Sequence, residues 1–280
     1  MQLFIFGMGY SAGVLARRLR AQGWQVTGTG RGGTMPFSDR AAVLAALGLA
    51  SHVLSSVPPG RDGGDPVLAD YSAALRAAPA GWIGYLSSTG VYGDCGGAWV
   101  DETAPTGLGR RSARSAADQA WQALDPRVRV FRLPGIYGPG RSAFDRLADG
   151  SARRLIAPGQ VFSRIHVDDI AGGICAGFAG PPGVYNLADD EPCDANAVIE
   201  AAAQMLGIAP PPMVPLEAAN LSAMARAFYA ENRRVANGKA RRVLGWQPAY
   251  STYREGLRAL SATIRPSTAS AAPPALNADQ

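Results

Sequence analysis

The sequence predicts an α/β fold in which helices cover both faces of a doubly wound parallel sheet, followed by a smaller C-terminal lobe. Short apolar runs of strand length alternate with helix-length stretches up to residue 133. The first apolar run leads directly into a glycine-rich turn that opens a helix. The alternation loosens from residue 134 onward, and we place the smaller lobe there.

The N-terminal stretch predicts a strand, a glycine turn, a helix and a second strand. Residues 2–6 (QLFIF) are apolar, side chains up to Leu19 recur at helical spacing, and Gly23 is placed to end the helix. The run 24–30 (WQVTGTG) then supplies the second strand. This order is typical of a right-handed parallel βαβ unit, the opening of a Rossmann sheet.

The alternation predicts the remaining elements in order. Before residue 134 we expect helices at 39–47 and 66–77, a third helix that begins at the arginines of 110–114 and carries them, and strands at 51–57, 82–88 and 128–133. After it we expect turns at 134–140, a strand-like run at 160–167, a helix entered at 168–173, a short strand at 183–188, and mainly helices to residue 264.

These elements divide the chain into a Rossmann domain, a lobe and a tail. Residues 1–135 form the domain, and 166–190 are expected to return to it. Residues 136–165 and 191–265 form the lobe, laid over the carboxyl ends of the strands, where open α/β sheets hold their ligands. Residues 266–280 are poor in large apolar side chains and are expected to be a disordered tail.

The composition argues against several classes of protein. No apolar run approaches the roughly 18 residues that cross a bilayer, and no leader pattern follows Met1, so we expect a cytoplasmic protein without a membrane partner. The net charge of +5 comes from basic residues scattered among acids, which argues against nucleic-acid binding. Cys95, Cys175 and Cys193 show no CxxC spacing, which argues against a disulfide framework or a zinc site.

The glycine turn predicts a dinucleotide site. Gly7, Gly9 and Ala12 fit the pattern G-x-G-x-x-G/A: the first permits the tight turn, the second lets a pyrophosphate approach the backbone, and the third lets helix and strand pack closely. The candidate cofactor-binding residues of the turn are Gly7, Met8, Gly9, Tyr10, Ser11 and Ala12. The alternative is a glycine turn that binds nothing.

The end of the second strand favours NADP over NAD. An acid about 20 residues beyond the glycines would bind the ribose 2′-hydroxyl of NAD, but the sequence there is VTGTGRGG. Arg31 stands at this point and can pair with a 2′-phosphate through charge-assisted hydrogen bonds. A solvated Arg31, with NAD as the cofactor, is the alternative.

Four stretches, in this order and at approximately this spacing, resemble extended and atypical short-chain dehydrogenases/reductases, the NAD-dependent epimerase/dehydratase family. They are FGMGYSAG, YLSSTGVYGD, FRLPGIYGPG and RIHVDDIA, and the resemblance extends to about residue 260. It implies an NADP-binding Rossmann domain and a lobe that recognises a sugar nucleotide or another small hydroxyl or carbonyl substrate. Phe6 replaces the first glycine that extended members usually carry, which suits the atypical branch.

The resemblance also implies positions for the reacting groups. The family's serine at the end of the fourth strand falls on Ser88, with Thr89 beside it. The family's loop beside the nicotinamide falls on Pro134, Gly135 and Ile136. We therefore expect Ser88 to align a substrate oxygen and the loop to contact the cofactor.

The family's Tyr-x-x-x-Lys pair is absent. In relatives the lysine cation lowers the tyrosine pKa so that the tyrosine can pass a proton near neutral pH. The two positions fall on Arg110 and Arg114, and the only lysine, Lys239, stands four residues after Val235. Arg114 could keep the cationic role, but a protonated Arg110 cannot act as an acid/base. The arginines could anchor an anionic substrate; the alternative is a solvated helix face.

Two tyrosines are candidates to replace the missing proton donor, Tyr92 and Tyr137, although both also fit structural motifs of the family. In the HVDD stretch we expect Asp168 to cap a helix and His166 to satisfy a buried hydrogen bond, in preference to metal binding.

Two hypotheses follow: an NADP-dependent oxidoreductase or epimerase with an unconventional proton donor, and an NADP-binding sensor or regulator without turnover. Relatives often dimerise through the two long helices of the Rossmann domain, so a homodimer is a further expectation, with the helices near Tyr71 and Arg114 at its interface.

Overall fold

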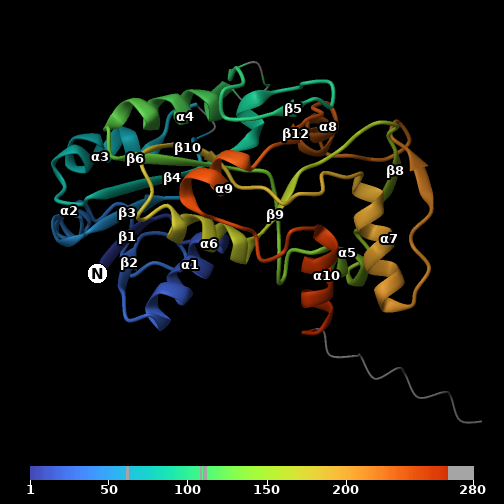
Figure 1. Ribbon diagram of the computed structural model, residues 1–280, viewed down its shortest axis with the longest axis horizontal. Helices are drawn as coiled ribbons and strands as arrows, with labels where there is room; N and C mark the ends of the chain where they lie inside the picture. Colours follow the sequence, from blue (N-terminus) through green and yellow to red (C-terminus); the bar gives the residue numbers. More distant parts are fainter. Residues whose placement is uncertain (61–62, 108, 110–111, 264–280) are drawn as a thin grey trace, which may run out of the picture.

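The computed structural model describes residues 1–60, 63–107, 109 and 112–263. Within these residues a six-stranded parallel sheet has the order β10-β6-β4-β3-β1-β2 (Figure 1). Its strands are β1 (Gln2–Phe6), β2 (Gln25–Gly28), β3 (His52–Ser55), β4 (Trp82–Ser88), β6 (Val128–Leu133) and β10 (Gly183–Asn186). The prediction of a doubly wound α/β fold is confirmed. The tail expected over 266–280, Arg110 and Arg111 lie outside the described residues.

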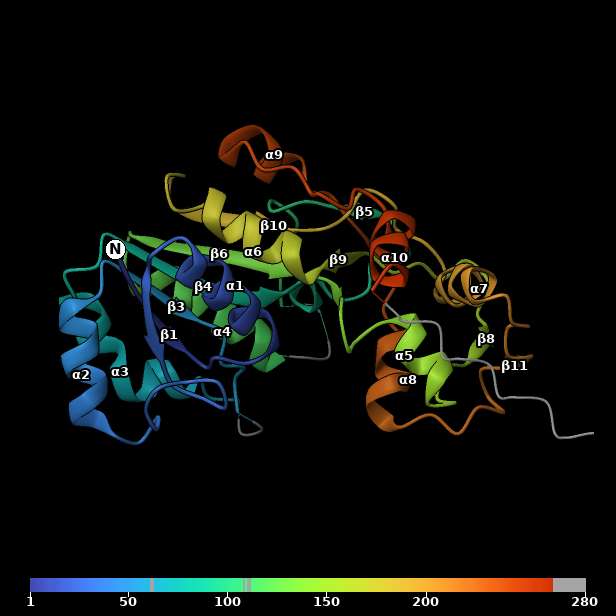
Figure 2. The same ribbon diagram turned by 90° about the horizontal axis from the view of Figure 1, so that it is seen from below.

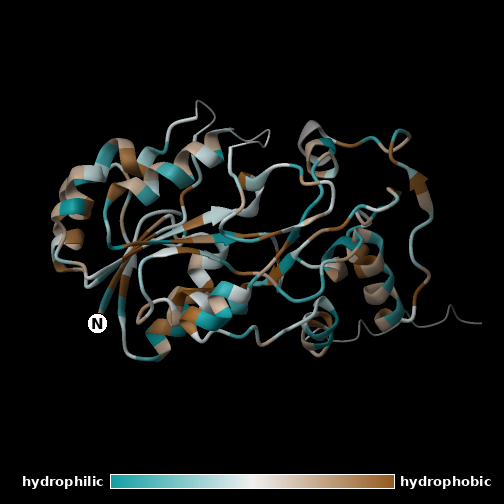
Figure 3. Cartoon of the chain, turned by 45° about the horizontal axis from the view of Figure 1, so that its top comes forward, coloured by the Kyte–Doolittle hydropathy of each residue, from teal (hydrophilic) through white to brown (hydrophobic). Residues whose placement is uncertain are grey.

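Helices cover both faces of this sheet (Figures 1 and 2). One apolar cluster packs α1, α6 and α9 on the first face, and a second packs α2, α3 and α4 on the other. The bounds are α1 (Tyr10–Ala21), α2 (Arg40–Leu49), α3 (Pro66–Ala77), α4 (Ser112–Leu124), α6 (Val167–Ala176) and α9 (Gly238–Leu244). Because apolar side chains cover both faces, strands such as β4 and β6 are buried almost throughout. Figure 3 shows hydrophobic residues gathered along the central sheet.

Local sequence signals explain where these helices begin and end. Asp65 precedes α3 and accepts hydrogen bonds from the N–H groups of Val67 and Leu68, while Pro66 occupies the first helical position. Gly23 follows the end of α1, and its N–H donates to the carbonyl of Arg20. No helix in the described part of the chain is long and apolar enough to cross a membrane.

The lobe lies beyond one end of the sheet and has its own apolar cluster (Figure 2). Its elements are α5 (Ala143–Ala148), β8 (Arg154–Ile156), α7 (Ala195–Leu206), β11 (Met213–Pro215), α8 (Ala223–Tyr229) and α10 (Tyr253–Ser261). Two short parallel pairs connect it to the sheet, β7 (Gly135–Tyr137) with β9 (Arg164–His166) and β5 (Trp99–Val100) with β12 (Arg234–Val235). A 3₁₀ helix, η1 (Thr89–Tyr92), follows β4 directly.

The short strands were not predicted in this form. Residues 135–137 form β7 where turns were expected, and β5, β8, β11 and β12 have no counterpart among the predicted elements. Each has two or three residues, which is too short for an alternating pattern to be recognised. Their pairing depends on partners far away in the sequence.

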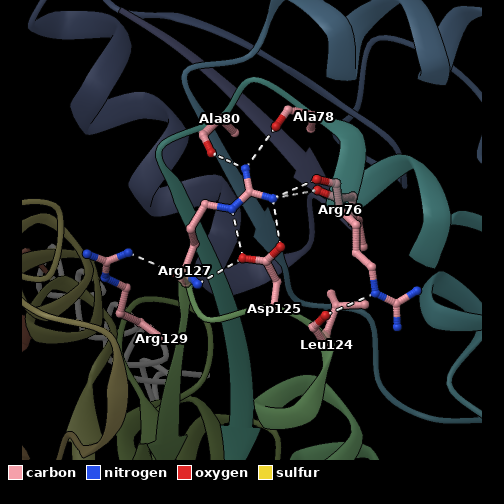
Figure 4. A network of polar contacts seen from close by, with 8 residues as sticks. Arg76, Ala78, Ala80, Leu124, Asp125, Arg127 and Arg129 are labelled. Carbon is pink, nitrogen blue, oxygen red and sulfur yellow. Dashed lines mark hydrogen bonds and ion pairs between the residues drawn. The ribbon is translucent and has the colours of Figure 1, made fainter.

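A guanidinium group makes a network of hydrogen bonds at the end of the sheet where β6 begins, opposite the carboxyl ends of the strands (Figure 4). Arg127, immediately before β6, makes two hydrogen bonds to the carboxylate of Asp125, at 2.7 and 2.8 Å. It also donates to the carbonyls of Arg76, Ala78 and Ala80 at 2.7 to 2.9 Å. These bonds satisfy carbonyl groups at the C-terminal end of α3, where a cation is also favoured by the helix dipole. This network stabilises the sheet at a distance from the candidate site.

Candidate functional site

The glycine turn after β1 is tightly packed against the turn after β3. Gly7 has a φ of +78°, a conformation that L side chains rarely adopt. A Cβ atom at Gly7 would lie 2.7 Å from Cγ2 of Val57 and 3.3 Å from its backbone nitrogen. Met8 donates its N–H to the carbonyl of Thr29 at 2.6 Å, which fixes the turn against the end of β2. The turn therefore requires a residue without a side chain at Gly7.

The N-terminus of α1 is open to an anion. Gly9 occupies the N-cap position, is exposed and offers no side-chain capping bond, and the first turn of α1 carries no acid. The first N–H groups of a helix have no intrahelical partner and lie at the positive end of its dipole. The N–H groups of Gly7, Met8 and Gly9 are bonded within the turn, to Thr29 and to the carbonyl of Gly7. The first N–H groups of α1, at 10–12, therefore fit the pyrophosphate of a dinucleotide, beside a turn that only glycine can form.

Arg31 stands on a fixed turn beside this helix end. Thr34 donates its N–H to the carbonyl of Gly28 at 2.7 Å, and Gly32 donates to the carbonyl of Met8 at 3.0 Å. The Arg31 side chain is exposed, and no carboxylate of the described residues forms an ion pair with it. Its guanidinium is therefore available to a ligand.

The structure brings Ser88 together with the loop predicted to contact the nicotinamide. Ser88 ends β4 and pairs with Leu133 at the end of β6, so it lies next to Pro134, which begins the loop. The Ser88 hydroxyl accepts a hydrogen bond from the N–H of Gly90 at 3.1 Å and is half-buried. Thr89 is buried, with 4% of its surface exposed. Gly135 and Ile136 are half-buried in β7.

Tyr92, a candidate proton donor, is buried, and its hydroxyl is bonded on two sides. Only 1% of its surface is exposed, and burial raises the pKa of its hydroxyl. The hydroxyl donates to Oδ1 of Asn186 at 2.8 Å and accepts from Nη1 of Arg132 at 3.0 Å. A hydroxyl held on both sides and shielded from a ligand cannot pass a proton to one in this arrangement.

The bonds to Tyr92 belong to a buried ionic network that the sequence analysis missed. Arg132 of β6 makes two hydrogen bonds to Asp118 of α4, at 2.7 and 3.0 Å, and Ser87 donates to the same carboxylate at 2.5 Å. The side chains of Arg132 and Asp118 are only 3% and 0% exposed. An arginine in the apolar strand VRVFRL was the available signal. The network lies directly before Ser88 in β4 and fixes the end of that strand.

Arg114 lies half-buried on α4 and faces β4 instead of solvent. It is close to the hydroxyl of Tyr85, a β4 residue three positions before Ser88. Burial raises the pKa of Tyr85, and the positive charge of Arg114 opposes that rise. Arg114 is therefore not part of a solvated helix face.

Tyr137 and His166 pack together in the lobe. Their ring centroids are 5.1 Å apart, and burial raises the pKa of the Tyr137 hydroxyl. His166, and not Asp168, caps α6: its Nδ1 accepts the N–H of Asp168 at 3.2 Å, because the helix begins two residues earlier than a cap at Asp168 requires. Nearby Asp189 is 1% exposed, and burial raises its pKa to about 8. The described residues contain no cluster of three or more metal-ligating side chains.

A cavity of about 350 Å³ opens in the lobe. It is formed by the segment 155–161 together with Asp194, Asn196, Met213 and Arg234. The segment leads into β9, which pairs with β7 immediately after Pro134. The lining combines apolar side chains with polar ones that also hold the lobe together: Asn196 bonds the backbone of Leu155, Asp194 caps α7, and Arg234 donates to the carbonyl of Gly97.

Comparison with known proteins gives a relative that spans nearly the whole chain. No family model matches the chain. A functionally unknown conserved protein from Silicibacter pomeroyi is 46% identical, with a TM-score of 0.83 and coverage of 94% of this chain and 98% of that one. A Streptomyces 3-diazoavenalumate denitrifying reductase is 32% identical over 142 residues, which is 46% of this chain; the match spans 45% of that protein's length.

More distant solved structures share the fold. A human epimerase family protein, solved with NADPH, is 18% identical and superposes with a TM-score of 0.72 over 94% of this chain and 100% of that one. At this identity the likeness concerns the fold, and it confirms the predicted α/β fold with a parallel sheet and a smaller C-terminal lobe.

Proposed function

We propose that this chain, which belongs to the same family as the Silicibacter pomeroyi protein, is an NADP(H)-dependent oxidoreductase or epimerase/dehydratase-like enzyme acting on a small hydroxyl or carbonyl substrate. The observation that carries the proposal is the turn at 7–12, which combines a glycine-only conformation with an uncapped helix N-terminus. The NADPH in the human epimerase family structure and the reductase name of the Streptomyces relative support it.

The residues divide between cofactor and substrate in this proposal. The backbone of 7–12 binds the pyrophosphate, Arg31 binds the 2′-phosphate, and Pro134, Gly135 and Ile136 lie along the nicotinamide. Bound NADPH supplies a hydride. Ser88 aligns a substrate oxygen at the shared edge of β4 and β6, while the lobe cavity around Arg234 holds the remainder of the substrate.

Replacing Arg31 with alanine separates the two dinucleotides. We expect Arg31→Ala to raise the Kd of NADPH at least ~10-fold and to change the Kd of NADH by no more than about 2-fold, because only NADPH carries the 2′-phosphate. Kd values from nicotinamide fluorescence titrations provide the test. Arg153→Ala, which removes an exposed arginine in the lobe, is the matched control. Equal losses of affinity for NADPH and NADH in Arg31→Ala would contradict the assignment of Arg31 to the 2′-phosphate.

Replacing Ser88 with alanine tests the catalytic half of the proposal. If its hydroxyl aligns the substrate, Ser88→Ala is expected to lower kcat at least ~10-fold while the Kd of NADPH stays unchanged. Turnover is followed by NADPH absorbance with a panel of nucleotide sugars and small carbonyl compounds. Because the hydroxyl also accepts the N–H of Gly90, a thermal melt of the variant is the control for folding. An unchanged rate would remove Ser88 from the mechanism.

A second candidate function is an NADP(H)-binding sensor or regulator. It is favoured by the arginines at both positions of the missing Tyr-x-x-x-Lys pair and by the burial of the Tyr92 and Tyr137 hydroxyls. Tight NADPH binding without turnover across the whole substrate panel would select this candidate. Turnover with any member of the panel would select the enzyme.

A further inference from the structure

The segment after β7 forms a rigid turn that presents an arginine. Gly138 and Arg141 exchange two backbone hydrogen bonds, at 3.0 and 3.3 Å, around Pro139 and Gly140. Gly140 has a φ of +70°, and proline in front of such a glycine is typical of a type II turn. The backbone leading to Arg141 is therefore fixed before any ligand arrives.

This turn is tied to the glycine turn, although the two are far apart in the sequence. The hydroxyl of Tyr10, the first residue of α1, donates to the carbonyl of Pro139 at 3.1 Å. The guanidinium carbon of Arg141 lies 5.9 Å from the centroid of the Tyr10 ring, within the range of a cation–π contact. Arg141 is thus placed beside the exposed N-terminus of α1.

The charge at this place is not neutralised by a direct partner. The Arg141 side chain is exposed, and no ion pair within the described ranges involves it. Burial raises the pKa of the Tyr10 hydroxyl; the charges of Arg141 and Arg17 oppose that rise, and those of Asp168 and Asp145 add to it. A guanidinium held on a rigid turn, without a carboxylate of its own, is suited to a bidentate contact with a phosphate.

We propose that Arg141 binds the pyrophosphate of the dinucleotide, from the side opposite the backbone N–H groups of α1. The inference rests on the proposed cofactor site and adds to it a residue from the lobe side of the fold. The turn 138–141 then forms the second wall of that site, with Tyr10 as the contact that sets its position. Arg141 and Arg31 bind different phosphates of the same molecule, and this difference makes their roles separable.

The test uses three probes and two arginine variants in the full-length protein. NADPH carries the pyrophosphate and the 2′-phosphate, NADH carries only the pyrophosphate, and adenosine 2′-phosphate carries only the 2′-phosphate. We expect Arg141→Met to raise the Kd values of NADPH and NADH alike, by about 10-fold, and to leave the Kd of adenosine 2′-phosphate unchanged. Arg31→Ala is expected to give the converse pattern. Arg141→Lys, which keeps the charge but not the planar fork, should lose less than Arg141→Met.

Arg18→Met is the control. Arg18 is an exposed arginine of α1, and its side chain lies toward Gly172 of α6. It removes the same net charge and is expected to change neither dinucleotide. An Arg141→Met loss confined to NADPH and adenosine 2′-phosphate would place Arg141 on the 2′-phosphate and overturn the inference, as would unchanged Kd values. If the unmodified protein binds neither NADPH nor NADH, the proposed cofactor site itself fails.

Discussion

Arg132→Met is expected to lower the free energy of unfolding by about 3 to 5 kcal/mol, the cost of leaving one partner of a buried ion pair without its counter-charge. Arg132 contributes two hydrogen bonds to Asp118 and one to Tyr92. Asp118 is fully buried, and without the guanidinium its carboxylate keeps only the neutral donors Ser87 and Gln122. Methionine fills much of the same volume, so the substitution leaves little empty space and cavity formation contributes little to the change.

Urea unfolding followed by tryptophan fluorescence measures this effect. The matched control is Arg254→Met, because Arg254 and Glu191 form an exposed pair at 3.5 Å that is expected to contribute less than about 1 kcal/mol. The double variant Arg132→Met with Asp118→Leu removes both charges and should recover at least half of the loss. If Arg132→Met costs no more than Arg254→Met, the network does not stabilise the end of β4 as described.

Gly7→Ala is expected to reduce NADPH affinity about 100-fold, equivalent to ~2.8 kcal/mol. The added Cβ would lie 2.7 Å from Val57, and the φ of +78° is itself unfavourable for alanine. Because the strand on one side and α1 on the other are fixed by packing, the turn would have to move. Its N–H groups would then no longer converge on the pyrophosphate.

Gly48→Ala provides the control for this substitution. Gly48 lies within α2, and an added Cβ would meet nothing within 4 Å, so this variant should bind NADPH normally and gain about 0.5 to 1 kcal/mol in stability. Fluorescence titrations and thermal melts of both variants are compared. Normal NADPH binding by a folded Gly7→Ala protein would contradict the assignment of the turn as the pyrophosphate site.

The strands and helices of the central sheet were predictable because local patterns mark each of them along the chain. Strands buried on both faces, such as β4 and β6, are mostly apolar runs of strand length, and helices such as α3 carry recognisable starts, here Asp65–Pro66. Such signals depend on a few neighbouring residues. The two-residue strands β5 and β12 depend instead on a partner more than a hundred positions away, and no local pattern marks them.

The candidate site was predictable in its positions but not in all its roles. The glycine turn and Ser88 could be located because their spacing reflects backbone geometry. The burial of Tyr92 could not, since it depends on Asn186 and Arg132 from two other strands. The helix cap was misplaced for a local reason: aspartate is a common N-cap residue, yet α6 begins at Val167 and leaves that position to His166.

Titration of the purified full-length protein with NADPH and with NADH, followed by nicotinamide fluorescence, tests the central claim most directly. We expect saturable binding of both dinucleotides, with NADPH bound at least ~10-fold more tightly because Arg31 adds a charge-assisted contact. Absence of binding by either dinucleotide would contradict the account, because the turn at 7–12 would then serve only the architecture of the sheet.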